Sequence, residues 1–418
     1  MSLVKTSLLN SVSVAIKILS GVVINKLFAI YIGPAGYSTY GQFQNILTVA
    51  NNCAGGVFLS GVTKETAGNF ENARKQHIFW SNAIKLTLIM AFITSGLIFF
   101  NIERIKVAFF PLESGVSTLY LLVILLPLIA LNNLFLSIVN GKKENYLYVY
   151  INIVGNIIFG IIGSLAIIYF GLSGIIYSML LSPLLGLIFC LKKILKIEWI
   201  KLKNLLEPID RKTFNKISLY ALMGATSAIL VPLTTLYIRS YIEINYGMKS
   251  AGNWQAVQKI SDLYLGIITS TLSIYFLPRI AEIKNFRELT LEIKKVYLFV
   301  LPLVISLASL IYVFRNILIE YLFSKEFSEL SELFFWQMIG DVFKMGSWVM
   351  AYIMIGRGLV KSYIGTEILF CGVSYGLNVL FMDQYGLIGS TMGYAICYLL
   401  YWATIFFTIK YQIRELFI

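Results

Sequence analysis

The chain contains few of the residues that build metal sites and catalytic centres. Its 418 residues include a single histidine, His77, and four cysteines that lie far apart within apolar stretches. One histidine excludes a His-based metal site and a Ser-His-Asp relay, and the cysteines offer neither a CxxC pair nor a disulfide framework. Gly141-Lys142-Lys143 lacks the upstream glycine and the following Ser or Thr of a phosphate-binding P-loop. We therefore expect no metal, no cofactor and no ATP consumption by this chain.

Charged residues are also scarce. They make up 13% of the chain, about half of the ~25% that is usual for a globular protein, whereas hydrophobic types make up 58% and aromatic types 15%. The mean hydropathy is +0.78. A water-soluble fold cannot hide this much apolar surface, so the composition excludes a soluble enzyme, a nucleic-acid binder and a disordered linker. It predicts a membrane protein.

Apolar stretches long enough to cross a bilayer as helices recur along the whole sequence. A helical span needs about 20 apolar residues, and these runs are too long for the strands of a β-barrel. The predicted spans cover residues 7–32, 38–63, 78–100, 117–139, 147–169, 173–191, 218–242, 251–277, 296–314, 333–355, 362–382 and 387–409. The predicted fold class is all-α, a polytopic membrane protein with about 12 transmembrane helices.

Lysine and arginine are distributed unequally between the two sides of this arrangement. Of the 28 that lie outside the spans, 23 fall on the side that carries both chain ends and 5 fall on the other side. Because positively charged loops stay in the cytoplasm, the N- and C-termini are predicted to be cytoplasmic. Most of the net charge of +13 thus reflects topology and attraction to anionic lipid headgroups, and does not indicate nucleic acid.

The two halves of the sequence repeat one module. Similar residues recur at an offset of 211 and, after a four-residue insertion, at an offset of 215; examples are Gly41 and Gly252, Gln44 and Gln255, Lys142 and Arg357, and Gly171 and Gly386. Six spans per half is an even number, so the halves run parallel, with a substrate path between them. The predicted domains are an N-terminal six-helix bundle at 1–191, a cytoplasmic linker at 192–216 and a C-terminal six-helix bundle at 217–418, around a central cavity.

Several charged side chains fall within the predicted spans, where each costs at least about 2.5–3.5 kcal/mol. Such groups usually face a cavity and serve a function. The cations are Lys17, Lys26, Lys85, Arg239, Lys259 and Lys344, and the anions are Asp262, Asp341 and Glu367. Lys26, Lys85 and Arg239 lie closer to span ends, where extension of the side chain to the membrane surface is the alternative.

Polar residues line one face of three predicted helices. The spacing i, i+4, i+7 is shared by Gln255, Lys259 and Asp262, by Gln337, Asp341 and Lys344, and, without charge, by Gln44, Thr48 and Asn51. Residues at this spacing lie on one side of a helix and are expected to face a water-filled cavity. The alternative is that each lysine pairs with the aspartate three residues away. Trp254 and Trp336 precede two of the glutamines and are interpreted either as interfacial anchors or as platforms for a sugar ring.

Five segments of the chain resemble a known family of exporters. They are Ile32-Gly33-Pro34-Ala35-Gly36, Gly61-Val62-Thr63-Lys64, Trp254-Gln255, Ile260-Ser261-Asp262 and Trp336-Gln337-Met338-Ile339-Gly340-Asp341-Val342-Phe343-Lys344. Over essentially its full length the sequence resembles the polysaccharide transport family of the multidrug/oligosaccharidyl-lipid/polysaccharide exporter superfamily. Within that family it is most similar to the O-antigen and enterobacterial common antigen translocases, in the lipid III flippase branch.

The resemblance implies a flippase, not an enzyme. Its members move an undecaprenyl-pyrophosphate-linked oligosaccharide from the cytoplasmic to the periplasmic leaflet of the bacterial inner membrane, with the polymerase and chain-length regulator as candidate partners. The residues expected to bind this substrate are Lys17, Lys26, Gln44, Asn51, Lys64, Arg239, Trp254, Gln255, Lys259, Trp336, Gln337 and Lys344. Lysine and arginine side chains can neutralise the pyrophosphate, whereas amides can bond to sugar hydroxyls and tryptophans can stack on sugar rings. Asp262, Asp341 and Glu367 are expected to couple transport to a proton or sodium gradient.

Two alternatives stay open. A multidrug cation antiporter of the same fold needs an acidic cavity, whereas the predicted cavity is net basic. A membrane O-antigen polymerase has similar hydropathy but needs a long periplasmic loop with catalytic arginines. The longest polar loop of this chain is predicted to be cytoplasmic, which disfavours the polymerase.

Overall fold

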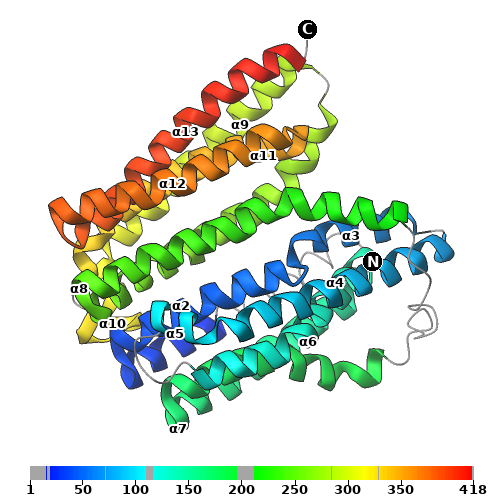
Figure 1. Cartoon of the computed structure of the whole chain (residues 1–418). Coiled ribbons are helices and arrows are strands. Elements are labelled where there is room, and N and C mark those ends of the chain that lie inside the picture. The colour runs from blue at the N-terminus through cyan, green and yellow to red at the C-terminus, as the bar shows by residue number, and fades with distance from the viewer. Residues whose placement is uncertain are drawn as a thin grey trace. The chain divides into compact units, whose positions relative to one another are not determined.

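The computed structural model describes residues 16, 19–70, 72–109, 116–194, 211–283, 285–327 and 329–416. Every regular element in these ranges is helical (Figure 1). The first part of the chain forms α2 (Gly33–Cys53), η1 (Gly56–Phe58), α3 (Leu59–Gly68), α4 (Ala73–Phe100), α5 (Ile102–Phe109), α6 (Val116–Gly141) and α7 (Asn145–Ile194). The second part forms α8 (Arg211–Glu282), α9 (Phe286–Val313), α10 (Arg315–Leu322), η4 (Lys325–Phe327), α11 (Leu330–Arg357), α12 (Val360–Tyr385) and α13 (Ile388–Leu416).

Many of these helices are long and apolar enough to cross a bilayer. Seven described helices meet that condition, or eight if α2 and α3, which are bent by 62° at their junction, form one broken span. The prediction of an all-α, polytopic membrane protein is therefore confirmed. The number twelve stays a prediction, although α7 and α8 each contain a break, at Gly171 and Gly247, between two of the predicted spans.

Contacts within the chain define two compact units. The first comprises residues 1–32 and 40–233, and the second comprises residues 33–39 and 234–418. The start of α2 therefore belongs to the second unit, and the first part of α8 belongs to the first. The predicted bundles, which end at residue 191 and begin at residue 217, were defined from the predicted spans and not from contacts. These limits stay a prediction. Most of the predicted linker at 192–216 lies outside the described residues.

Glycines at an offset of 215 residues adopt the same backbone conformation. Gly171 has φ 58° and ψ −138°, and Gly386 has φ 66° and ψ −152°, a region that only glycine adopts readily. Three residues later, a Cβ on Gly174 would collide with the carbonyl of Ala166, and a Cβ on Gly389 with the carbonyl of Phe381. Each half of the chain thus makes the same tight helix connection with its matching glycines.

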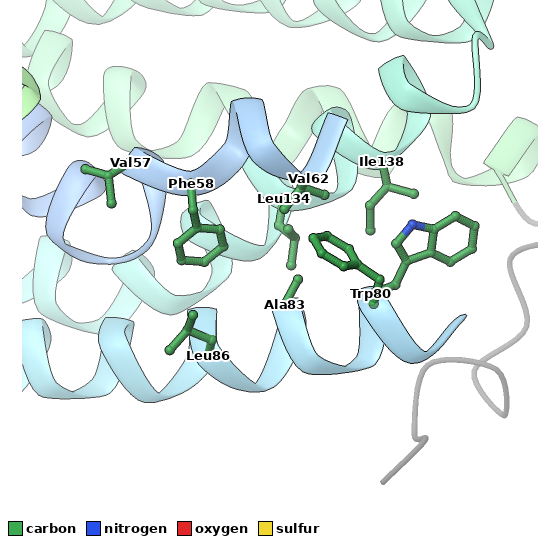
Figure 2. Packing of buried hydrophobic residues seen from close by; sticks show 9 residues of the cluster. Val57, Phe58, Val62, Trp80, Ala83, Leu86, Leu134 and Ile138 are labelled. Carbon is green, nitrogen blue, oxygen red and sulfur yellow. The ribbon is translucent and has the colours of Figure 1, made fainter. Parts of the chain in front are cut away.

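The bend between α2 and α3 is held by an apolar cluster in the first unit. Gly55 has φ 121°, which places it in the left-handed region and breaks the helix. Figure 2 shows side chains of the η1–α3 segment pointing toward those of α4, with residues of α6 beside them. The cluster consists of Val57, Phe58, Val62, Phe79, Trp80, Ala83, Leu86, Leu134 and Ile138.

Candidate functional site

The second unit contains a fully buried carboxylate, Asp341, in the middle of α11. Its position depends on two glycines of the same helix. A Cβ on Gly340 would run into the Tyr394 ring, and one on Gly346 would lie 2.8 Å from the Trp402 ring. Because these glycines lack side chains, α13 packs closely against α11 and brings its tyrosines to the buried carboxylate.

Four side chains donate hydrogen bonds to Asp341. Oδ2 accepts from the Ser261 hydroxyl at 2.6 Å and from the Tyr264 hydroxyl at 2.7 Å, both on α8. Oδ1 accepts from the Tyr394 hydroxyl of α13 at 2.8 Å and from Gln337 Nε2 at 3.3 Å. The carboxylate is 0% exposed. Three helices therefore stabilise the anion with hydroxyl and amide donors in place of bulk water.

The hydrogen-bond network extends along one face of α8. Gln337 Nε2 also donates to the Ser261 hydroxyl at 3.1 Å, and Gln258 Nε2 donates to Gln337 Oε1 at 3.2 Å. Gln337 and Asp341 share one face of α11, as their spacing predicts. Both are fully buried against polar residues of α8 and α13, so the expectation that they face a water-filled cavity is wrong in this conformation. These bonds join α8 to α11 beside the carboxylate.

Lys344, one helical turn after Asp341, has a different environment. Its Nζ lies 5.1 Å from the centre of the Trp348 ring, 5.7 Å from that of Tyr394 and 5.6 Å from that of Tyr398. Its ion-pair partner is Asp262 of α8, at 3.9 Å, with the two side chains 10% and 65% exposed. The alternative that lysines pair with aspartates three residues away is therefore wrong for Lys344, because the aromatic rings and Asp262 hold its ammonium between helices.

Glu367 of α12 belongs to a second buried acidic position. It accepts a hydrogen bond from the Tyr401 hydroxyl at 2.5 Å and is 6% exposed. The Phe370 ring packs on the rings of Tyr398 and Tyr401, with centroids 4.9 and 4.5 Å apart. Because Tyr398 also faces Lys344, aromatic rings link the two sites.

Three of the predicted substrate residues contact one another near the break of α8. Arg239 is 1% exposed, donates a hydrogen bond to Gln255 Oε1 and lies with its guanidinium 5.6 Å from the centre of the Trp254 ring. Trp254 is also buried, which excludes both interfacial anchoring and stacking on a sugar in this conformation. The contacts join the two parts of α8 on either side of Gly247.

Four of the remaining predicted residues belong to the first unit. In the first unit, Lys26 and Asn51 are half-buried, Lys64 is exposed and Gln44 donates to the Tyr40 hydroxyl at 3.1 Å. Asn51 Oδ1 is buried and finds no partner in the described part of the chain.

Two others lie in the second unit, and one falls outside the structure. Lys259 is half-buried, and so is Trp336, whose ring contacts that of Phe335. Lys17 lies outside the described residues.

Sequence reasoning missed the tyrosines of this unit. Tyr394, Tyr398 and Tyr401 follow the spacing i, i+4, i+7, the same pattern that identified the polar faces of α8 and α11. Ser261 and Tyr264 are three residues apart on α8. Counting tyrosine as a polar residue within a span would have placed Tyr394, Tyr398 and Tyr401 on one polar face, without showing which carboxylate they contact.

The arrangement can bind both signs of charge. The donors around Asp341 can stabilise its anion, and the carboxylate can exchange them for a proton or a cation. The ammonium of Lys344 pairs with Asp262, which is 3.9 Å away and exposed, so an anionic oxygen can replace this partner. Among the described residues, no group of three or more His, Cys, Asp or Glu side chains could hold a metal ion.

Comparison with known proteins finds a matching protein family and similar proteins along nearly the whole chain. The family described as "Polysaccharide biosynthesis protein" matches residues 3–284. The "Lipid III flippase" of Escherichia coli (strain K12) is 28% identical over 411 residues, covering 96% of this chain and 97% of that protein. The "Putative O-antigen transporter" of Shigella flexneri is 24% identical, covering 95% of each chain.

A solved structure shares the fold. It is the inward-facing conformation of a multidrug resistance MATE family transporter of the MOP superfamily, with a TM-score of 0.79 and 15% identity. The alignment covers 96% of this chain and 95% of that chain. The fold is therefore that of MATE transporters.

Proposed function

Because this chain belongs to the polysaccharide biosynthesis protein family, we propose that it is a flippase for an undecaprenyl-pyrophosphate-linked oligosaccharide. The observation that carries the proposal is the 28% identity to a lipid III flippase across nearly all of both chains. The second relative is named as a transporter too. Both names describe movement of a molecule, which supports a transporter rather than an enzyme.

In this proposal the protein works by alternating access in the bacterial inner membrane. Twelve spans form two parallel six-helix bundles around a central cavity, and both termini lie in the cytoplasm. The glycan lipid enters from the cytoplasmic leaflet and leaves to the periplasmic leaflet. An undecaprenyl chain can stay in the lipid while the pyrophosphate and sugars, which are costly to bury in hydrocarbon, cross inside the protein.

Lys344 is the residue proposed to bind the pyrophosphate. The three rings around it shield the ammonium from lipid, and Asp262 is a weak partner because it is 65% exposed and 3.9 Å away. A pyrophosphate oxygen can replace Asp262. Gln258, half-buried beside Gln337, is a suitable neighbour for sugar hydroxyls.

Asp341 is proposed to carry the coupling ion. The hydroxyls of Ser261, Tyr264 and Tyr394, from two other helices, all donate to the Asp341 carboxylate. Protonation of this carboxylate, or a cation bound to it, would weaken these hydrogen bonds. The occupancy of one carboxylate can therefore favour one packing of α8, α11 and α13 over another. Arg239, Trp254 and Gln255, by contrast, are assigned to supporting α8 at its break.

Reconstituted vesicles test this function. The full-length protein is placed in vesicles that carry a radiolabelled polyprenyl-pyrophosphate-linked oligosaccharide, and an impermeant glycosidase reports the fraction accessible from outside. We expect the protein to make the inner-leaflet substrate accessible, with Lys344→Gln impaired and Lys295→Gln, which changes an exposed lysine of α9, unimpaired. An inactive wild-type protein that instead exports ethidium would favour the multidrug antiporter.

A further inference from the structure

A basic and aromatic cluster in the first unit belongs to neither of the sites above. It lies where the α6–α7 turn meets the α3–α4 turn and contains Phe70, Gln76, Trp80, Lys142 and Lys143. Lys142 directly follows the span that ends at Gly141, and Phe70 lies three residues before the span that begins at Ala73. Both ends are therefore at the depth of the lipid headgroups.

Lys142 is held in place by buried side chains. Its Nζ donates to Gln76 Oε1 at 3.0 Å, and Gln76, which is 1% exposed, donates in turn to the Thr66 carbonyl at 2.8 Å. Trp80 Nε1 donates to the Thr66 hydroxyl at 2.9 Å. The Lys142 ammonium lies 5.1 Å from the centre of the Phe70 ring and 5.8 Å from that of Trp80. These contacts fix the position of the Lys142 ammonium.

Lys143 places a second ammonium group near the Phe70 ring. Its Nζ lies 5.6 Å from the centre of Phe70, which is 48% exposed. Lys143 forms no ion pair within the part of the chain that the structure describes. At the end of a span, an exposed aromatic ring such as Phe70 inserts at the membrane surface. The two ammonium groups beside it attract anions.

The backbone of Lys143 is strained, and the second half of the chain shows that the strain is avoidable. Lys143 has φ 58°, and it is the only non-glycine residue with positive φ among those described. The position 215 residues later is Gly358, with φ 69°. The helix ends are alike, since the amides of residues 143 and 144 bond to the carbonyls of 140 and 139, and those of 358 and 359 to 355 and 354.

Glycine suits this helix end because a side chain disfavours the left-handed conformation. The first half nevertheless places lysine there, directly after Lys142 and against Phe70. A residue that costs stability at a position where its repeat counterpart is glycine points to a function for its side chain.

We propose that Lys142, Lys143 and Phe70 form a binding site for the phosphate group of an anionic bilayer phospholipid. The two ammonium groups bind the phosphate, and the ring lies among the upper parts of the acyl chains. Burial lowers the pKa of Lys142, the neighbouring Glu144 carboxylate partly opposes that shift, and a bound phosphate would oppose it further. The site does not depend on the flippase proposal, because a structural lipid can bind any membrane protein.

The test compares Lys143→Gly with wild type in lipid discs of phosphatidylcholine, with and without phosphatidylglycerol. Removing the strained side chain should leave the thermal midpoint in pure phosphatidylcholine equal to or above that of wild type. Phosphatidylglycerol should raise the midpoint of wild type and of Lys143→Arg. For Lys143→Gly, the apparent affinity for phosphatidylglycerol should fall about tenfold, as expected for loss of one hydrogen bond between an ammonium and a phosphate oxygen.

Lys295→Gln is the matched control, because it removes an exposed lysine near the start of α9. It should keep the wild-type response. An equal loss there would show that only general surface charge matters, and a Lys143→Gly protein that melts lower in phosphatidylcholine would show that Lys143 is needed for packing. A full response by Lys143→Gly, or a response of wild type to polyprenyl pyrophosphate but not to phosphatidylglycerol, would also overturn the proposal.

Discussion

Replacing Asp341 with asparagine tests whether the buried carboxylate carries the coupling ion or only joins helices. The substitution keeps the size of the side chain and removes its negative charge. Four donors, from Ser261, Tyr264, Gln337 and Tyr394, then face an amide with a single acceptor oxygen. We expect Asp341→Asn to lose transport while the protein keeps normal abundance in the membrane.

The cost in stability follows from the hydrogen bonds. A hydrogen bond to a charged group contributes about 1.5–3 kcal/mol, whereas side-chain hydrogen bonds within membrane proteins average about 0.6 kcal/mol. Tyr394→Phe deletes one donor and should lower the free energy of unfolding by about 1–2 kcal/mol. Asp341→Asn weakens four bonds but keeps an acceptor, so we expect a loss of about 2–3 kcal/mol, which a native protein with about 5–15 kcal/mol tolerates.

The assay measures transport and thermal stability for the single and double variants. Tyr394→Phe, which keeps the carboxylate, should lose stability but retain transport. Asp341→Asn combined with Lys344→Gln should stay inactive, because the ion-pair partner of Lys344 is Asp262. Recovery of transport by that double variant would refute the reasoning, since it would show that Asp341 serves only to balance the lysine.

Three further predictions address helix support, backbone strain and orientation. Arg239→Gln should lower membrane abundance and thermal stability, by about 1–3 kcal/mol, because the buried Arg239 supports the break in α8. Gly171→Ala should destabilise by about 1–3 kcal/mol in a thermal melt, since its φ is 58°. Its control, Gly96→Ala in open space within α4, should instead stabilise by about 0.5–1 kcal/mol. In a cysteine-free background in intact cells, an impermeant maleimide should label Lys249→Cys and not Lys361→Cys, and the reverse pattern would invert the predicted topology.

The sequence alone determined the helices, because a bilayer span requires an uninterrupted apolar run of fixed minimum length. The predicted spans 78–100, 333–355 and 362–382 lie within α4, α11 and α12. The predicted gap at 170–172 contains the break at Gly171, since glycine adopts a conformation there that closes a tight connection. The repeat at an offset of 215 was likewise readable, as Gly171 and Gly386 share one backbone geometry.

The partners of the charged residues were decided by the tertiary structure. The spacing of Asp341 and Lys344 predicts that they share a face toward a cavity, with an ion pair between them as the alternative. Glycines at 340 and 346 instead let α13 approach, so that Tyr394 reaches Asp341 while the rings of Trp348 and Tyr398 surround Lys344. Periodicity describes one helix at a time, whereas the depth and rotation at which a second helix packs depend on side-chain volumes from both. For that reason the buried carboxylate could be found from the sequence, but the hydroxyl groups that stabilise it could not.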